Sequence, residues 1–175
     1  MDGDGSRLVR WGERALRWCA VANIGFGVLA VGCLIASFVA EPLLAAQLGR
    51  KYRDAVFIPA VIWELRTLIL IGVIAVWPLD RCLRALADVL RSVRRGAPFD
   101  PDNAARVTTI GWGLVGVQCV DLFGSALTAL IARTGADVAA WTPSLAGWIS
   151  VLIAFVLARV FAAGARLDAE LEGTV

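Results

Sequence analysis

The stretch WCAVANIGFGVLAVGCLIASFVA, residues 18–40, runs for 23 residues without a charged side chain. A helix of that length is about 34 Å long, enough to cross a hydrocarbon core of about 30 Å. The apolar part of a cleavable signal peptide is shorter, about 7–15 residues, and precedes a small-residue cleavage site that this stretch lacks. Residues 18–40 therefore predict a retained transmembrane helix.

Three further apolar stretches repeat this pattern, over residues 56–79, 108–131 and 142–163. The last one opens with Thr142-Pro143, which predicts an N-cap followed by proline at the first helical position. Because a chain in lipid must satisfy its backbone hydrogen bonds internally, these lengths indicate helices. The predicted fold class is all-α: a polytopic membrane protein with four transmembrane helices, packed as a bundle into a single domain over residues 1–175.

The composition agrees with lipid as the solvent and argues against an enzyme. Hydrophobic residues make up 59% of the chain and charged residues 18%, against about 45–50% and about 25% in soluble domains. The absence of histidine removes the commonest general base and metal ligand. No two of the four cysteines lie within four residues of each other, so zinc-site spacing is missing. We expect no enzymatic activity, no cofactor and no metal.

Positive charges predict the orientation of the helices, because short cytoplasmic loops carry an excess of Lys and Arg. One side of the membrane holds twelve arginines: Arg7, Arg10, Arg14, Arg17, Arg81, Arg84, Arg91, Arg94, Arg95, Arg106, Arg159 and Arg166. The other side holds Arg50, Lys51, Arg53 and Arg133. Both termini and the loop 80–107 are therefore predicted to be cytoplasmic.

The segment RRGAPFDPDNAARV, residues 94–107, separates two helices in that loop. Pro98 disfavours helical geometry at Ala97 and so ends the helix before it. Asp100 is suited to cap the next helix, with Pro101 in its first turn. The segment predicts a helix stop and restart at the cytoplasmic surface.

The region before this turn carries a heptad-like stripe: Leu79, Leu83, Leu86, Leu90 and Val93 follow one another at intervals of 4, 3, 4 and 3 residues. Such spacing predicts that the second span continues as an amphipathic cytoplasmic helix. Two interpretations stay open. The stripe lies on the membrane or on the protein's own tails, or it offers Leu83, Leu86, Leu90 and Val93 to a partner helix.

Four charged residues fall inside predicted spans. Arg159 is about 6 Å from the inner end of its span and can reach the headgroups, which leaves Glu64, Arg66 and Asp121. A charge at mid-membrane costs at least about 2.5 kcal/mol, so each is a candidate functional residue. Arg66 and Asp121 each lie about 15 Å from the outer end of their span, and we expect them to form an ion pair. Glu64 is closer to the outside and is expected to reach water or the cluster Arg50, Lys51 and Arg53. The charges either fix helix packing, which is favoured, or line a proton or ion path.

Two cytoplasmic stretches carry a family resemblance. RRGAPFDPDNAARV resembles the Gly-x-Pro-Phe…Asn…Arg signature of the bacterial domain-of-unknown-function family 2975, and FAAGARLDAELEGTV, residues 161–175, resembles its closing Phe-x-x-Gly-x-x-Leu…Thr-Val pattern. The signature positions in this chain are Gly96, Pro98, Phe99, Asn103, Arg106, Gly164, Leu167, Thr174 and Val175. The resemblance implies a small four-span protein of the bacterial inner membrane. It also suggests a pairing with a short helix-turn-helix regulator, because relatives tend to be encoded beside one.

The chain departs from the family pattern at two positions. Arg159 and Glu170 stand where many relatives have an acidic residue and an aspartate, respectively. A role that rests on those acids does not carry over to this protein.

The leading functional hypothesis is a non-enzymatic regulator or sensor that acts through its cytoplasmic face, on a small helix-turn-helix regulator. The alternative is a small transporter or accessory subunit that uses Glu64, Arg66 and Asp121. The expected partner besides the regulator is the lipid bilayer, and a homo-oligomer stays open. Direct nucleic-acid binding is not expected at a net charge of +2.

The acidic tail after Gly164 carries Asp168, Glu170 and Glu172. Opposite charges attract, so this tail is expected to cover the arginines of the amphipathic helix when no partner is bound. A partner would then compete with the tail for that surface.

The predicted topology is testable by cysteine labelling in intact cells. A membrane-impermeant thiol reagent should modify a cysteine introduced at Gln47 or Ala136 and should not modify one at Ala97. Efficient external labelling at Ala97 would invert the topology.

Overall fold

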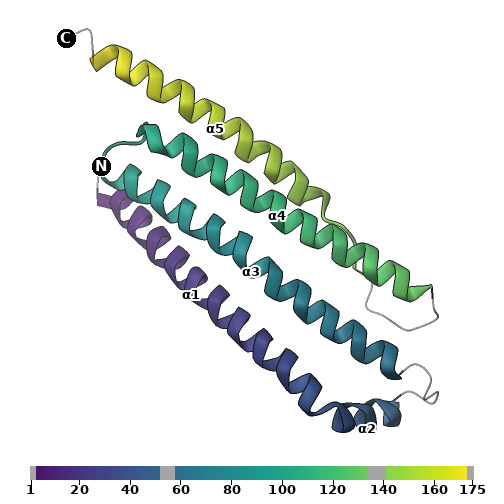
Figure 1. The fold of residues 1–175 in the computed structure, drawn as a ribbon. Coiled ribbons are helices and arrows are strands. Elements are labelled where there is room, and N and C mark those ends of the chain that lie inside the picture. The colour runs from purple at the N-terminus through teal and green to yellow at the C-terminus, as the bar shows by residue number, and fades with distance from the viewer. Residues whose placement is uncertain (1–2, 52–57, 134–140, 173–175) are drawn as a thin grey trace.

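The computed structural model describes residues 3–51, 58–133 and 141–172. Its elements are α1 (Gly3–Val39), α2 (Glu41–Lys51), α3 (Ile58–Arg94), α4 (Pro101–Ala132) and α5 (Leu145–Glu172) (Figure 1). Helices α1, α3, α4 and α5 are each long and apolar enough to cross a membrane. The predicted all-α fold with four transmembrane helices is confirmed.

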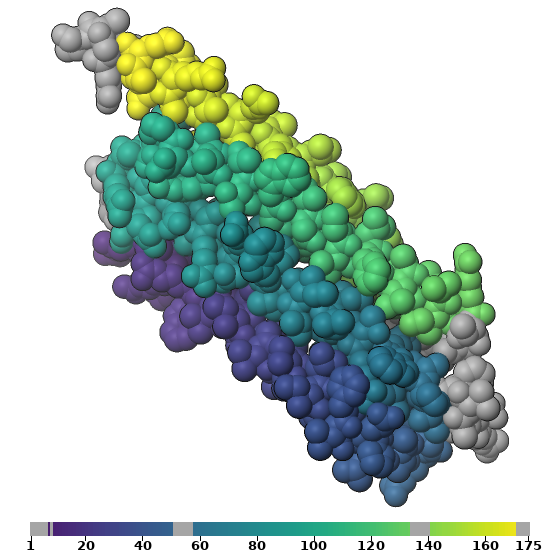
Figure 2. All heavy atoms as spheres, viewed as in Figure 1, coloured from purple at the N-terminus to yellow at the C-terminus, as the bar shows by residue number. Residues whose placement is uncertain are grey.

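The four long helices form one layer in the order α1, α3, α4, α5: the extensive contacts join neighbours in that order, and a small buried cluster brings α3, α4 and α5 together at one end (Figure 1). The space-filling view shows them as adjacent ridges, with none covering another on that face (Figure 2). The prediction of a bundle, in which the helices would enclose a common core, is therefore wrong for the described residues.

The positions of the helix contacts explain the layer. On α3, Val76 meets Gly27 of α1, while Pro78 meets Gly116 of α4. Two residues along a helix correspond to about 200°, so these contacts lie on nearly opposite sides of α3. Helix α4 repeats the arrangement, since Gly111 meets Phe155 of α5 and Gly113 meets Cys82 of α3. Contacts on opposite sides place the helices in a row.

The contact between α3 and α4 is the closest approach in the layer. A Cβ added to Gly116 would lie 2.9 Å from Pro78 Cβ, and one added to Gly113 would lie 2.9 Å from the Pro78 carbonyl oxygen. Side chains at these two positions would push the helices apart, so glycine is required for this packing.

Helix α3 runs unbroken for 37 residues with Pro78 inside it. It therefore contains both the second span and the predicted amphipathic extension. The extension continues straight on, between α1 and α4, and does not turn into the plane of a membrane (Figure 1).

The predicted turn between α3 and α4 is confirmed. Helix α3 ends at Arg94, and Gly96 adopts a φ of 81°, a backbone conformation that favours glycine. Asp100 is the N-cap of α4, and its Oδ1 accepts a hydrogen bond of 2.9 Å from the Asp102 amide. Pro101 is the first helical residue.

Two local predictions were wrong. Helix α5 begins at Leu145, and Thr142 is not its cap, since Ser144 Oγ accepts a hydrogen bond of 3.2 Å from the Gly147 amide. The connection after the first span contains a further helix, α2, where the sequence analysis predicted none. Its segment EPLLAAQLGRK is rich in Ala and Leu and has proline in the first turn, a combination that favours a helix.

Candidate functional site

The arginine-rich end of the layer, here called the basic end, contains residues 3–17 of α1, 80–94 of α3, the turn 95–100, residues 101–107 of α4 and residues 159–172 of α5. The signature stretch 94–107 and the described part of the second one, residues 161–172, lie there.

Asn103 holds the turn together. Its side chain is completely buried. Its Nδ2 donates to Ser92 Oγ at 2.6 Å and to the Pro98 carbonyl at 3.0 Å, and its Oδ1 accepts from Arg106 Nη1 at 2.7 Å. A buried amide with both ends satisfied fixes the groups around it. The end of α3, the turn and the start of α4 are thereby joined as one unit.

Arg106 extends this network to the surface. Its guanidinium lies 3.4 Å from Asp100 Oδ2 and 3.3 Å from Asp102 Oδ2, while it also donates to Asn103. The arginine thus links the N-cap of α4 to the buried amide, and both signature residues have structural partners within the turn.

The two signature stretches meet in space through two aromatic side chains. Phe99 packs on Gly164 of α5, where an added Cβ would lie 2.5 Å from Phe99 Cδ1. Phe161 packs against the buried cluster of Val89, Val107 and Ala158. The motif spacing alone did not reveal this contact, which joins the ends of α3, α4 and α5.

Glu13 of α1 is an important residue that the sequence analysis missed. It is only 4% exposed, and it pairs with Arg17 in its own helix and with Arg91 at 3.6 Å and Arg94 at 3.4 Å. One buried carboxylate thus ties α1 to the α3 extension. The signal available was a single acid among four arginines, at a position four residues before Arg17.

The predicted stripe on α3 divides into two sets. Leu83 and Leu90 are half-buried and face α1, and Leu90 Cδ1 lies 3.4 Å from the position of a Cβ at Gly12. Leu79, Leu86 and Val93, which are seven residues apart, remain 39%, 41% and 39% exposed. We call these three the exposed stripe. Each of the five residues of the heptad pattern is preceded by a buried residue. These buried residues are Pro78, Cys82, Ala85, Val89 and Ser92.

The predicted cover of the arginines by the acidic tail stays a prediction, and the carboxylate that pairs with both Arg91 and Arg94 in the described residues is Glu13. Helix α5 continues to Glu172 and packs on α4, one helix away from α3. Figure 1 shows its C-terminal end projecting beyond the other helices. Leu167 is 62% exposed, whereas Thr174 and Val175 lie outside the described residues.

Arg66 has different partners from those predicted. Its Nη2 donates to the Ser37 carbonyl at 2.7 Å and pairs with Glu41 Oε2 at 2.8 Å, and its Nε donates to Ser37 Oγ at 3.1 Å. The guanidinium carbon also lies 3.9 Å from the ring centroid of Phe38. The predicted pair with Asp121 is wrong, because Arg66 joins α3 to the junction of α1 and α2.

Asp121 joins α4 to the start of α5. Its Oδ1 accepts from Trp141 Nε1 at 2.6 Å, and its Oδ2 accepts from the Ser144 amide at 2.9 Å. Gln118 Nε2 adds a hydrogen bond of 3.0 Å to the Ser144 carbonyl. Since α5 begins opposite the middle of α4, it extends further than α4 at the basic end.

Glu64 is 7% exposed on α3. The sequence predicted that Glu64 reaches water or the basic cluster Arg50, Lys51 and Arg53. Of that cluster, Arg53 lies outside the described residues. The three intramembrane charges are not brought together: Arg66 is held by α1 and α2, and Asp121 by the start of α5.

Metal or cofactor ligands are not grouped in the described part of the chain, where no three His, Cys, Asp or Glu residues form a metal-binding cluster. Its four cysteines are free thiols. Buried Cys82 donates to the Ile110 carbonyl at 3.4 Å and serves the contact between α3 and α4.

The family described as "Protein of unknown function (DUF2975)" matches residues 15–175. The chain belongs to this family, as its two signature stretches indicated. No curated protein and no solved structure gives a significant match.

Replacing Asn103 by Ala should lower the free energy of unfolding by about 1–3 kcal/mol, because the Pro98 carbonyl and Arg106 lose a buried partner. Asn103→Asp should also destabilise, since it cannot donate to Ser92 and Pro98. Unfolding by SDS in mixed micelles measures both. Thr109→Ala on the exposed side of α4 is the control and should change little; equal effects would contradict the role of Asn103.

Arg66 should be coupled to Glu41 and not to Asp121. In a double-mutant cycle, Arg66→Gln with Glu41→Gln should give an interaction energy of about 1 kcal/mol, because the two side chains share an ion pair. Arg66→Gln with Asp121→Asn should be additive within about 0.5 kcal/mol. Coupling to Asp121 in unfolding measurements would restore the ion pair expected from depth alone.

Proposed function

We propose that this DUF2975 protein is a non-enzymatic regulator or sensor of the bacterial inner membrane that binds a cytoplasmic protein at its basic end. Both termini and the basic end would face the cytoplasm, as the distribution of arginines predicts. The observation that carries the proposal is the exposed stripe, Leu79, Leu86 and Val93, on a helix of 37 residues, which is longer than a membrane span needs.

The geometry of α3 supports a protein partner over the membrane surface. From Leu79 to Val93 the helix rises about 21 Å at 1.5 Å per residue. Because the extension continues the direction of the span, its far end stands away from the lipid. Leu83 and Leu90 already pack towards α1, and Leu79 is the last residue of the predicted second span. Leu86 and Val93 are therefore the apolar side chains of the heptad pattern left for a partner. Side chains seven apart on one helix match the anchors of a helix-in-groove contact.

The charges around the stripe favour an acidic or amphipathic partner. Arg94 and Arg95 are exposed next to Val93, and Glu13 neutralises only part of the positive charge of Arg17, Arg91 and Arg94. Opposite charges at the rim of an apolar contact increase the association rate and select the partner. A small helix-turn-helix regulator, which the family resemblance suggests, is the first candidate.

A sensing role is supported by the continuity of α3 from one end of the protein to the other. At one end Arg66 binds α1 and α2, and at the other Glu13 binds Arg91 and Arg94. A shift of α1 along α3 would therefore alter contacts at both ends. Such coupling through packed elements is the physical requirement for signal transfer.

The transporter alternative gains no support from the arrangement of the charges. Arg66 is bound where α3 contacts α1 and α2, and Asp121 is bound where α4 contacts the start of α5. A transport path needs polar groups in succession along one interface. The non-enzymatic assignment rests on the lack of histidine and of a visible nucleophile–base pair in the sequence.

The partner test uses co-purification with the product of a neighbouring gene for a helix-turn-helix protein. The wild type should retain that product. Leu86→Ser with Val93→Ser should reduce retention by about tenfold or more, because two apolar anchors are lost. Leu167→Ser is the matched control, an exposed leucine at the same end on α5, and should retain the partner. No retention by the wild type, or equal retention by the double variant, would contradict the proposal.

A further inference from the structure

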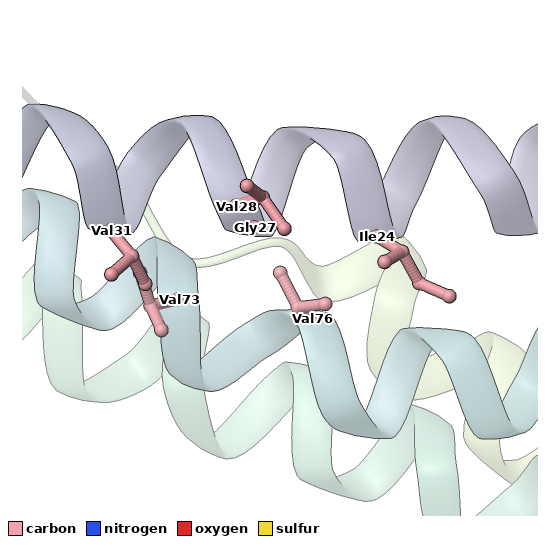
Figure 3. Close-up of a pocket in the computed structure, with 6 residues that line it drawn as sticks. All are labelled: Ile24, Gly27, Val28, Val31, Val73 and Val76. Carbon is pink, nitrogen blue, oxygen red and sulfur yellow. The ribbon is translucent and has the colours of Figure 1, made fainter.

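A groove follows the contact between α1 and α3 within the membrane-spanning part of the layer. Its apolar part has a volume of about 370 Å³ and is lined by Ile24, Gly27, Val28, Val31, Val73 and Val76. Figure 3 shows these residues where the two helices face each other; Val73 and Val76 belong to α3 and the others to α1. The lining has the chemistry of a hydrocarbon chain.

Towards the basic end of the layer, the apolar part of the groove continues into a second, basic part. This second cavity has a volume of about 410 Å³ and shares Ile24 with the apolar part. Arg17, Arg84 and Arg91 line it, together with Asp88 and apolar residues that include Leu16 and Leu83. The shared residue makes the two cavities one groove, apolar along one part and cationic at one end.

The packing of α1 on α3 explains why the groove exists. Gly27 has no side chain, and a Cβ there would lie 3.1 Å from Val76 Cγ2. Asn23 Nδ2 donates to the Val76 carbonyl at 3.0 Å and fixes the two helices at this level. The helices are therefore held close behind the groove, while Val28 remains 69% exposed at its edge.

We propose that this groove binds one anionic phospholipid, with an acyl chain along the apolar part and the phosphate at Arg17 and Arg84. From Arg17 to Val31 the groove spans about 21 Å of helix. One leaflet of a bilayer, including headgroups, is about as deep. A single lipid thus matches both the length of the groove and its change from apolar to cationic.

The arginines are oriented by carboxylates and still leave positive charge in the groove. Glu13 holds Arg17 and Arg91 from a buried position, Asp80 holds Arg84 at 2.7 Å, and Asp88 holds Arg91 at 2.7 Å. Of these carboxylates, Asp88 alone is in the lining. The Arg17 and Arg84 side chains are 64% and 63% exposed, so both can reach a phosphate. Arg94 also pairs with Glu13, so four arginines share three carboxylates and one positive charge is left beside the groove. A net positive charge favours an anionic headgroup over a zwitterionic one.

Tryptophans place the basic part at the membrane surface. Trp18 follows Arg17 directly and is 73% exposed, and Trp77 on α3 is 66% exposed. Arg81 lies over the Trp77 ring, 4.8 Å from its centroid. Exposed tryptophans mark the headgroup region of a bilayer. Arg17 and Arg84 therefore lie at the depth of lipid phosphates, whereas Arg91, seven residues further along α3, lies about 10 Å beyond them.

Native mass spectrometry of the protein in detergent tests the site. Phosphatidylglycerol should bind in one copy and about tenfold more tightly than phosphatidylcholine with the same chains. Arg17→Gln with Arg84→Gln should weaken phosphatidylglycerol binding by about thirtyfold. Arg7→Gln with Arg10→Gln, which removes two exposed arginines outside the groove, is the matched control and should leave binding unchanged.

The apolar part has its own test, Val28→Trp, which fills the groove from an exposed position and should weaken binding of both lipids. Glycerol phosphate, which lacks acyl chains, should not bind detectably. Equal losses in the two arginine variants, unchanged binding by Val28→Trp, or tight binding of glycerol phosphate would overturn the proposal. A lipid-free dimer that is lost in Val28→Trp would assign the groove to a second copy of the chain and would also overturn it.

Discussion

The arrangement of this protein depends on helix α3 having two contact sides about 200° apart. Val76 meets Gly27 of α1 on one side, and Pro78 meets Gly113 and Gly116 of α4 on the other. Helix α4 repeats the arrangement with Gly111 facing α5. A layer follows, with two open faces and a groove beside each helix contact. A closed bundle would have buried the surfaces on which both the partner contact and the lipid site are proposed.

Polar side chains in this protein join helices near their ends. Arg66 joins α3 to α1 and α2, and Asp121 joins α4 to the start of α5. Glu13 and Asn103 do the same at the basic end. Since polar groups in lipid gain most from internal partners, a few such contacts fix the register of apolar helices that would otherwise slide. The intramembrane charges are better explained by this role than by an ion path.

The two family signatures share one structural purpose at the basic end. Asn103 and Arg106 shape the turn between α3 and α4, and Phe99 attaches α5 to that turn through Gly164. These residues are largely occupied with one another. The surface left for other molecules is adjacent to them: the exposed stripe on α3 and the arginines towards α1.

The sequence by itself determined the four spans, the extension of the second helix and the turn at Gly96–Asp100, because these depend on local hydropathy, helix spacing and capping. It did not determine helix α2, the cap at Ser144, the partners of Arg66 or the layer itself. Every apolar face of a helix is equivalent in lipid, so hydropathy does not say which faces meet. Shape at Gly27, Gly113 and Gly116 decided that, and the resulting order of helices then decided which polar residues came within reach of one another.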